Sequence, residues 1–482
     1  MNKLLQLSRI QQITNGHWLA PPSNSDIEVR VGAFDTRSLN FAEIFFAWPG
    51  DQSDGHDYLQ QLEGSGIKLV IVEKEIPPLS NFAVLKVDNS LDALQKIAKY
   101  LARDFAGKIV SITGSSGKTT AKTWLNHLLK DHFNVLSNPG SFNNHIGCPI
   151  TILSLNTDHN LMILEMGSSG LGELEILSAI APADITLLLN VGHAHLGKFK
   201  TLENTYRAKT EIFANQRNGA VSILPYGDQR LTPYWPAGKV QTFGKGSPEY
   251  SYQIVSIDPV KKMQRILFQT PFGEKTINVG QLGNYVGELL SALLAVCFRL
   301  GLSWLDIETR LQSLPQEKGR STFLNGIKGV LLLDDTYNAN PESMISMLET
   351  ICSLQMEQYV GVVGNLAELD TDLNESAEFI LSNLPDKLTT LFLSGETGKI
   401  LTPLIQKRKP RLKTVYASSV VEIIEQLQPM LNPRTVIGIK GSRSSQMERV
   451  VHGLSGTQFS CVLKTCGRLN SCDVCDSFSV SA

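Results

Sequence analysis

The 482-residue sequence lacks the features that would place it among nucleic-acid-binding, membrane or secreted proteins. Its 44 lysines and arginines nearly balance 46 aspartates and glutamates, so the formal net charge is −2 and no overall basic field attracts nucleic acid. No stretch approaches the ~20 consecutive apolar residues of a transmembrane helix. The N-terminal MNKLLQLSRIQQITNG has no long apolar segment or small-residue cleavage site, unlike a signal peptide. We expect a cytoplasmic monomer without membrane insertion or nucleic-acid partner.

Cysteine is scarce before the C-terminus. Cys148, Cys297 and Cys352 are isolated in apolar surroundings, and we expect them to be buried. The remaining four form a C-x4-C-x5-C-x2-C array: Cys461, Cys466, Cys472 and Cys475. A zinc site is one interpretation, because zinc sites use C-x2-C pairs. We favour a flexible tail over residues 456–482, unrelated to catalysis, because the single C-x2-C has no well-spaced partner.

The length exceeds what one hydrophobic core supports, and apolar runs alternate with helical patterns. This alternation predicts an α/β protein, with strands in mainly parallel sheets. We expect a small N-terminal α/β domain over residues 1–106, a central domain over 107–318 and a third α/β domain over 319–455. No internal repeat or long low-complexity segment is present.

The segment KIVSITGSSGKTTAK, residues 108–122, predicts a nucleotide site at the start of the central domain. A buried strand leads into a glycine loop, and a helix opens at Lys118. Backbone N–H groups and the helix N-terminus suit a phosphate, the lysine adds positive charge, and a threonine hydroxyl suits Mg²⁺. The spacing is not the standard phosphate-loop pattern, because Ile112 stands where its first glycine is expected. The alternative is an ordinary Ser-Gly turn; we favour the nucleotide site.

Polar residues also follow other predicted strands of this domain. Glu165 ends an apolar strand at 161–164, and His195 follows another at 184–192. In parallel sheets ligands gather at the carboxyl ends of the strands, so we expect both residues near the loop at 114–120. Glu165 is then a candidate Mg²⁺ ligand. The alternatives are a helix-capping carboxylate for Glu165, a loop histidine for His195 and, for Lys209 on a helix, a solvated lysine.

The third domain opens with a strand over 330–335 that ends in two acids and continues as TYNANPESM. Its last strand, 435–439, is followed by Lys440, Ser442 and Arg443. In the N-terminal domain, Asp35-Thr36-Arg37-Ser38 and an Asp-Gly-His loop are polar groups at strand ends. They are either ligand contacts or turn-forming residues.

Together, the TGSSGKTT loop, DDTYNANPESM at 334–344, SFNNHIGCPITIL at 141–153 and FAWPGDQSDGHDY at 46–58 resemble the Mur ligase family over residues 30–453. The resemblance is strongest to members that act on UDP-linked muramoyl peptides. It implies an ATP- and Mg²⁺-dependent amide ligase, with a UDP-sugar-binding N-terminal domain, a central P-loop-type ATP-binding domain and a C-terminal Rossmann-like ligase domain. The implied reaction adds D-alanyl-D-alanine to UDP-N-acetylmuramoyl-tripeptide through an acyl phosphate, for peptidoglycan synthesis.

The resemblance also implies roles for single residues. Lys118 would bind the β- and γ-phosphates, and Thr119 with Glu165 would hold one Mg²⁺. His195 would help to hold a second, and Lys209 matches a commonly carbamylated lysine. Asp335 completes the implied catalytic set. The implied nucleotide contacts are Gly114, Ser115, Ser116, Gly117, Lys118, Thr119, Thr120, Asn284, the hinge arginine Arg320, Asp335 and Asn338. The implied substrate contacts are Asp35, Arg37, Ser38, Asn143, Asn144, Asn340, Lys440, Ser442 and Arg443.

The sequence departs from the family at three places, one of which is the Cys-rich tail after about residue 455. The His-Asn and Asn expected near 284 are replaced by Asn284, Tyr285 and Glu288, and the third-domain G-D-M-x-E-L-G pattern reads GNLAELD at 364–370. A paralogue that joins a different carboxylate and amine, or a non-catalytic nucleotide-binding protein, are therefore the alternatives. The retained phosphate-loop and acidic residues argue against the second.

Overall fold

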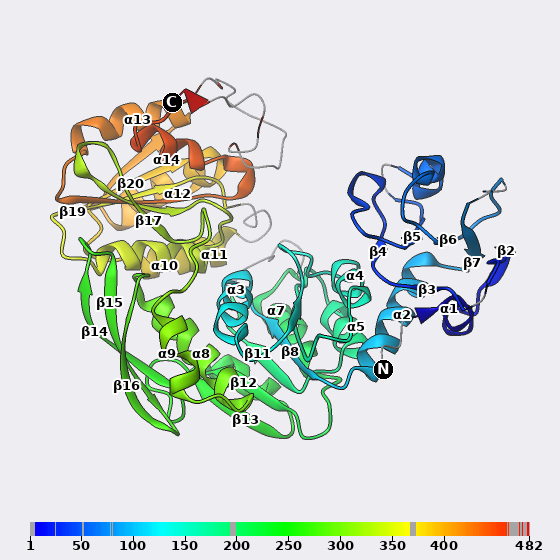
Figure 1. The fold of residues 1–482 in the computed structure, drawn as a ribbon. Helices are drawn as coiled ribbons and strands as arrows, with labels where there is room; N and C mark the ends of the chain where they lie inside the picture. Colours follow the sequence, from blue (N-terminus) through cyan, green and yellow to red (C-terminus); the bar gives the residue numbers. More distant parts are fainter. Residues whose placement is uncertain are drawn as a thin grey trace.

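The computed structural model describes residues 5–24, 26–50, 53–77, 79, 81–192, 199–366, 373–459, 461, 472, 475 and 480–481. It consists of three α/β units in chain order, as Figure 1 shows. The N-terminal unit stands apart from the C-terminal one, and the central unit lies between them. The predicted α/β class with mostly parallel sheets is confirmed.

The N-terminal unit contains a five-stranded sheet in the order β2-β7-β6-β5-β4, antiparallel only between β2 and β7. Its strands are β2 (His17–Ala20), β4 (Gly32–Ala33), β5 (Ile44–Phe46), β6 (Leu69–Val72) and β7 (Ala83–Lys86). The helices are α1 (Leu7–Thr14) and α2 (Ser90–Asp104), and β1 (Leu5–Gln6) pairs with β3 (Glu28–Val29). A 3-10 helix, Gly55–Leu62, lies between β5 and β6.

The N-terminal and central units share one hydrophobic core. Helix α2 packs against α4 (Gly147–Leu153) and α5 (Glu173–Ile180) of the central unit. Leu94 and Ile97 of α2 are fully buried in the same cluster as Ile152 and Leu174. Apolar burial of about 25 cal/mol per Å² therefore holds the N-terminal unit on the central one.

The central sheet is entirely parallel, in the order β13-β12-β11-β8-β10-β9. Its strands are β8 (Lys108–Thr113), β9 (Val135–Ser137), β10 (Leu161–Glu165), β11 (Ile185–Leu188), β12 (Val221–Pro225) and β13 (Lys239–Phe243). The chain leaves β8 to one side for β9 and β10, then crosses to the other side for β11. Such a reversal of strand order opens a crevice at the carboxyl ends of the strands.

Helices cover both faces of this sheet, which explains why its strands are continuous apolar runs. They include α3 (Lys118–Leu129), α7 (Leu202–Thr210) and α8 (Asn284–Arg299), while α9 (Trp304–Leu311) packs against α3. A three-stranded antiparallel sheet follows β13 and packs against α8: β14 (Ser251–Asp258), β15 (Met263–Thr270) and β16 (Gly273–Val279). Helix α8 is therefore buried between two sheets along most of its length.

The C-terminal unit has a six-stranded sheet in the order β17-β18-β22-β19-β20-β21, parallel except at β17. The strands are β17 (Thr322–Asn325), β18 (Leu331–Asp335), β19 (Gln358–Val363), β20 (Thr390–Ser394), β21 (Lys413–Ala417) and β22 (Thr435–Lys440). The helices are α10 (Pro341–Cys352), α11 (Leu373–Asn383), α12 (Gly395–Arg408), α13 (Val420–Leu427) and α14 (Glu448–Leu454).

Cys148, Cys297 and Cys352 are buried, as predicted. Beyond α14, β23 (Gln458–Phe459) pairs with β24 (Val480–Ser481). Among the described residues, no helix has the length and hydropathy of a membrane span.

Candidate active site

The loop between β8 and α3 has the backbone shape of an anion-binding loop. Gly117 precedes the first residue of α3 with φ of +80°, a left-handed conformation that glycine adopts without steric cost. A Cβ atom at Gly114 would lie 3.0 Å from Cβ of Leu189. Helix α3 then begins at Lys118, and the first N–H groups of a helix, together with its dipole, favour an anion.

Asn190, which follows β11, fixes this loop in place. Its Oδ1 accepts from the Ser116 N–H at 2.9 Å, and its Nδ2 donates to the Ser116 carbonyl at 3.2 Å. The Ser115 N–H donates to the Asn190 carbonyl at 3.1 Å. Sequence analysis missed Asn190, which it placed inside the strand predicted over 184–192.

The loop also positions Lys118. Its Nζ donates to the Gly114 carbonyl at 2.6 Å, so the ammonium lies over the loop. A phosphate bound by the loop would meet this charge. The arrangement provides backbone donors and a cation on one side of the crevice.

Glu165 ends β10 beside the loop and is 1% exposed. Its Oε1 accepts from Thr119 Oγ1 at 3.2 Å and from Asn143 Nδ2 at 2.6 Å. Its backbone forms two hydrogen bonds with the side chain of Asn138, at 2.8 and 2.9 Å. A carboxylate and a hydroxyl next to a phosphate-type loop are the oxygen ligands that Mg²⁺ takes.

Lys122 is a site residue that the sequence analysis missed. It is 4% exposed, and its Nζ lies 3.1 Å from Oε2 of Glu165. The same ammonium donates to the carbonyls of Asn138 at 2.8 Å and Gly140 at 2.5 Å. Helical spacing could have indicated this residue. Positions 118, 122, 125 and 129 share one face of α3, which is apolar at Leu125 and Leu129, so Lys122 lies on a face that packs inward.

The C-terminal unit supplies an acid–lysine pair at the carboxyl ends of neighbouring strands. Asp335 at the end of β18 accepts from Lys440 Nζ at 2.5 Å through Oδ2 and from the Ser321 N–H at 3.0 Å through Oδ1. Lys440 also donates to the Asn338 carbonyl at 2.8 Å. The adjacent Asp334 is buried, and this burial raises its pKa.

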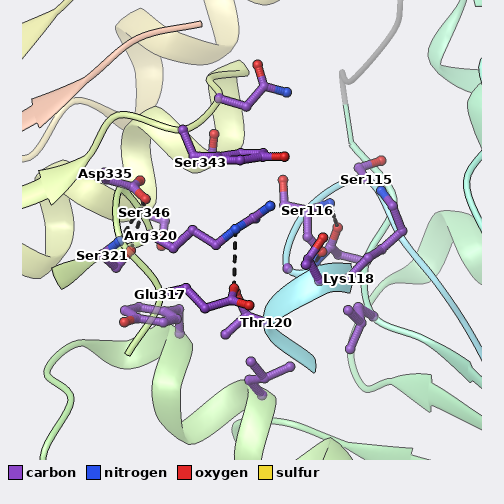
Figure 2. Close-up of a pocket in the computed structure, with 18 of the residues that line it drawn as sticks. Ser115, Ser116, Lys118, Thr120, Glu317, Arg320, Ser321, Asp335, Ser343 and Ser346 are labelled. Atoms are coloured by element: carbon purple, nitrogen blue, oxygen red, sulfur yellow. Dashed lines mark hydrogen bonds and ion pairs between the residues drawn. The ribbon is translucent and has the colours of Figure 1, made fainter. Parts of the chain in front are cut away.

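A cavity of about 590 Å³ separates the loop from these residues (Figure 2). Its wall combines the end of the central sheet, the 315–321 linker and the start of α10. The structure brings the following predicted residues into that wall: Ser115, Ser116, Gly117, Lys118, Thr119, Thr120, Asn143, Glu165, Arg320, Asp335, Asn338, Asn340 and Lys440.

Direct hydrogen bonds across the cavity join the central unit to the C-terminal unit. Asn340 Nδ2 donates to Ser116 Oγ at 3.0 Å, and the hydroxyls of Ser141 and Tyr337 are 3.4 Å apart. Asn340 is also the N-cap of α10, accepting from the Ser343 N–H at 2.9 Å. The same side chain therefore stabilises the start of α10 and contacts the phosphate loop.

The linker carries a second connection. The guanidinium carbon of Arg320 lies 3.9 Å from the centre of the Tyr337 ring, and its Nε is 3.3 Å from Glu317 Oε2. Glu317 Oε1 accepts from Thr123 Oγ1 of α3 at 2.6 Å. Sequence analysis gave Glu317 no role, because nothing in the sequence indicates its partners.

The cavity wall also includes an apolar group of residues: Trp124, Leu189, Phe243, Tyr285, Leu289 and Pro315. Glu288 lies in the same wall, and burial raises the pKa of both Glu288 and Tyr285. Asn284 is exposed at the start of α8 and is not part of the wall. An apolar wall of this kind suits the flat ring of a nucleobase.

The other predicted residues lie outside this wall. Lys209 is 1% exposed, and its Nζ donates to Ser168 Oγ at 3.1 Å. Asn144 accepts from the Gly147 N–H at 2.8 Å at the start of α4. Ser442 is buried with its hydroxyl 3.0 Å from that of Ser445.

Arg443 forms an ion pair of 2.5 Å with Glu448 and is likewise outside the cavity wall. Asp35, Arg37 and Ser38 belong to the N-terminal unit, where Arg37 Nη2 is 2.7 Å from Asp35 Oδ2. The Arg37 guanidinium lowers the pKa of the Asp35 carboxyl. His195 lies outside the described residues.

The C-terminal cysteines cluster near α14. Arg449 donates from Nε to the sulfur of Cys472 at 3.3 Å and from Nη2 to the sulfur of Cys461 at 3.4 Å. Cys475 packs against both cysteines, and Cys466 lies outside the described residues. Within the part of the chain that the structure describes, no group of three His, Cys, Asp or Glu side chains is arranged to hold a metal ion.

Comparisons with known proteins agree with this architecture. The family model described as Mur ligase middle domain matches residues 112–297, and that described as Mur ligase, glutamate ligase domain matches residues 319–443. A UDP-N-acetylmuramoyl-tripeptide–D-alanyl-D-alanine ligase from Synechocystis is 30% identical over 375 residues, covering 77% of this chain and 80% of the relative.

Two solved structures are similar over nearly the full length. A crystal structure of MurF from Acinetobacter baumannii superposes with a TM-score of 0.83 at 26% identity, covering 94% of this chain and 99% of that one. MurF ligase from Thermotoga maritima in complex with ADP has a TM-score of 0.76 at 26% identity, covering 89% and 97%.

Proposed function

Because the chain belongs to the Mur ligase family, we propose that it is an ATP-dependent ligase that adds D-alanyl-D-alanine to UDP-N-acetylmuramoyl-tripeptide in peptidoglycan precursor synthesis. The observation that carries this proposal is the cavity whose wall unites the phosphate loop, Glu165 and the Asp335–Lys440 pair. The alignment with the Synechocystis ligase of that name covers 80% of the relative's length. We further propose that the enzyme works in the cytoplasm, where ATP is available.

The residues of the loop fit a nucleoside triphosphate. We propose that Lys118 and the N–H groups at the start of α3 bind the β- and γ-phosphates, because they face the cavity from one side. When bound, ATP supplies the phosphoryl group that activates the terminal carboxylate of the tripeptide as an acyl phosphate. Binding and charge neutralisation dominate such a reaction, so no nucleophilic side chain is needed.

We propose that Thr119 and Glu165 hold one Mg²⁺ through their side-chain oxygens. Lys122 offsets the buried charge of Glu165, with Nζ 3.1 Å from Oε2. A bound Mg²⁺ would neutralise charge on the phosphates. The roles of His195 with a second ion, and of Lys209 as a carbamylated ligand, stay predictions; the buried Lys209 lies beside Ser168, three residues beyond Glu165.

On the opposite wall, we propose that Asp335, Asn338 and Arg320 contact the nucleotide or the incoming amine. The hydrogen bond between Lys440 and Asp335 holds this carboxylate at the end of β18. Asn340 and Asn143 are the proposed substrate contacts in the wall. Orienting carboxylate and amine at this surface is the main catalytic task, since alignment alone contributes several kcal/mol.

The N-terminal unit is the proposed site for the uridine nucleotide, through Asp35, Arg37 and Ser38. These residues form a 3-10 turn at the end of a short strand, with the Asp35 side chain accepting from the Arg37 N–H at 2.9 Å. A guanidinium near a turn suits a diphosphate. The unit's shared core with the central domain would hold the long substrate in one orientation.

The experiment is an assay of ATP-dependent phosphate release with UDP-N-acetylmuramoyl-tripeptide and D-alanyl-D-alanine, with the product mass measured by mass spectrometry. A pentapeptide product is expected. Phosphate release only with another acid and amine would favour a paralogue, which the unusual residues Asn284, Tyr285 and Glu288 leave as the second candidate. Nucleotide binding without turnover of any pair would contradict both.

A further inference from the structure

We infer that Glu317 is a positioning residue that, together with Tyr337, presets the guanidinium of Arg320 to receive the nucleotide phosphates. This inference rests on the proposed function, because it assumes that the cavity binds ATP. Glu317 has no role in any of the expectations above.

Arg320 is held on two sides. Its Nε lies 3.3 Å from Glu317 Oε2, and its guanidinium carbon lies 3.9 Å from the centre of the Tyr337 ring. The Tyr337 ring covers one face of the guanidinium, and the Glu317 carboxylate lies beside the edge that carries Nε. The side chain, which would otherwise carry about 2 kcal/mol of rotamer entropy, is restricted before any ligand arrives.

The two terminal nitrogens of Arg320 remain available. Among the described residues, neither Nη1 nor Nη2 has a hydrogen-bond partner, and the side chain lines the cavity. Figure 2 shows the Arg320 side chain extending from the linker toward Ser116 and Lys118, with a dashed line joining it to Glu317. Paired N–H groups of this kind bind phosphate oxygens in a bidentate manner.

Glu317 connects this arginine to the phosphate loop. Its Oε1 accepts from Thr123 Oγ1 at 2.6 Å, and Thr123 lies on α3, little more than one turn beyond Lys118. The Arg320 N–H donates to the Glu317 carbonyl at 3.0 Å, which fixes the turn of the linker. One carboxylate therefore holds the hinge arginine in register with the helix that binds the phosphates.

The alternative is that Glu317 acts only through its charge. A carboxylate near phosphates repels them, so its removal would then strengthen nucleotide binding. If Glu317 instead preorganises Arg320, its removal weakens nucleotide binding, because an unrestrained Arg320 must lose its rotamer freedom on binding. The two explanations are therefore separated by the direction of the change.

The test measures ADP binding by calorimetry in the presence of Mg²⁺, for the full chain and for Glu317→Gln. The glutamine can still accept from Thr123 but loses the ion pair with Arg320. ADP affinity is expected to fall about threefold to tenfold. In an Arg320→Met background the same Glu317→Gln change is expected to have no further effect on ADP affinity, because Glu317 acts through the arginine.

The matched control is Glu308→Gln on α9. Glu308 forms a comparable ion pair, 2.9 Å from Lys275, with side chains 31% and 35% exposed against 24% and 22% for Glu317 and Arg320. This control is expected to leave ADP affinity unchanged. Because the ion pair of Glu317 is partly exposed, the variant is expected to keep the thermal midpoint of the nucleotide-free protein within a few degrees.

Tighter or unchanged ADP binding by Glu317→Gln would overturn the inference, as would an equal loss in the Arg320→Met background. Failure of the unaltered protein to bind ADP at all would instead contradict the proposed function. A second readout separates positioning from simple structural damage. With substrates present, Glu317→Gln should raise the KM for ATP in the same ratio as it weakens ADP binding.

Discussion

The buried pair formed by Lys122 and Glu165 gives the sharpest prediction for stability. Lys122 is 4% and Glu165 1% exposed, and their charged atoms are 3.1 Å apart. Replacing Lys122 with methionine keeps much of the side-chain volume but leaves the carboxylate without its counter-charge. Removal of one partner from a buried pair costs about 3–5 kcal/mol.

Two further contacts add to this cost. Lys122 donates to the carbonyls of Asn138 and Gly140, at 2.8 and 2.5 Å. Each carbonyl that loses its donor in a buried place adds about 1 kcal/mol. The Asn138 bond is buried and the Gly140 bond only partly so. We therefore expect Lys122→Met to lower the free energy of unfolding of the central domain by about 4–6 kcal/mol, or the thermal midpoint by about 8–24 °C.

The assay is thermal unfolding of Lys122→Met, Glu165→Gln and the double variant. The double variant should lose about 2 kcal/mol less than the sum of the two single changes, because it no longer contains an unpaired buried charge. Additive losses, or a Lys122→Met variant within 1 °C of the unaltered protein, would refute the reasoning. Mg²⁺ with ADP should stabilise Lys122→Met more than the unaltered protein if Glu165 holds the ion.

Three further predictions follow from other contacts. Lys118→Ala should reduce ATP-dependent phosphate release at least about a hundredfold with an unchanged circular dichroism spectrum; near-normal release would contradict the phosphate-loop assignment. Asn340→Ala should destabilise the protein to thermal unfolding by about 1 kcal/mol, because α10 loses its cap and the contact with Ser116, and an unchanged midpoint would show that neither bond matters. The Lys74 ammonium, 2.7 Å away, lowers the pKa of the Asp54 carboxyl, so this group stabilises the fold at neutral pH and loses that effect as pH falls through and below its ordinary value of 3.8. The difference in thermal midpoint between the unaltered protein and Asp54→Asn should therefore shrink below about pH 4, and a gap constant from pH 7 to pH 3 would contradict this.

Several parts of the site could be predicted from the sequence because they depend on neighbours along the chain. A buried strand, a glycine loop and a helix starting at Lys118 form one continuous segment, and backbone chemistry makes that segment an anion site. Glu165 was predicted beside it because residues at the carboxyl ends of adjacent parallel strands meet. The resemblance to a family added residues that are far apart in sequence, such as Asp335 and Lys440.

The residues that were missed depend on contacts between distant segments. Lys122 was recognisable only as a lysine on an apolar helix face, and its partner Glu165 is 43 positions away. Glu317 meets Thr123 across the boundary between the linker and α3. Asn284 is the opposite case. Its position in the sequence predicted a contact with the nucleotide, but its side chain is exposed, and Tyr285 and Glu288 line the cavity instead.

The sequence by itself determined the elements of this protein: the apolar runs that become parallel strands, the glycine that permits a φ of +80° before α3, and the polar residues placed where strands end. These properties are local, because strand period, glycine conformation and helix start depend on residues a few positions apart. Only the tertiary structure decided which side chains face the cavity and which face away. That choice depends on how the central and C-terminal sheets approach each other, so a bond such as that from Asn340 to Ser116 exists only after both domains have folded and met.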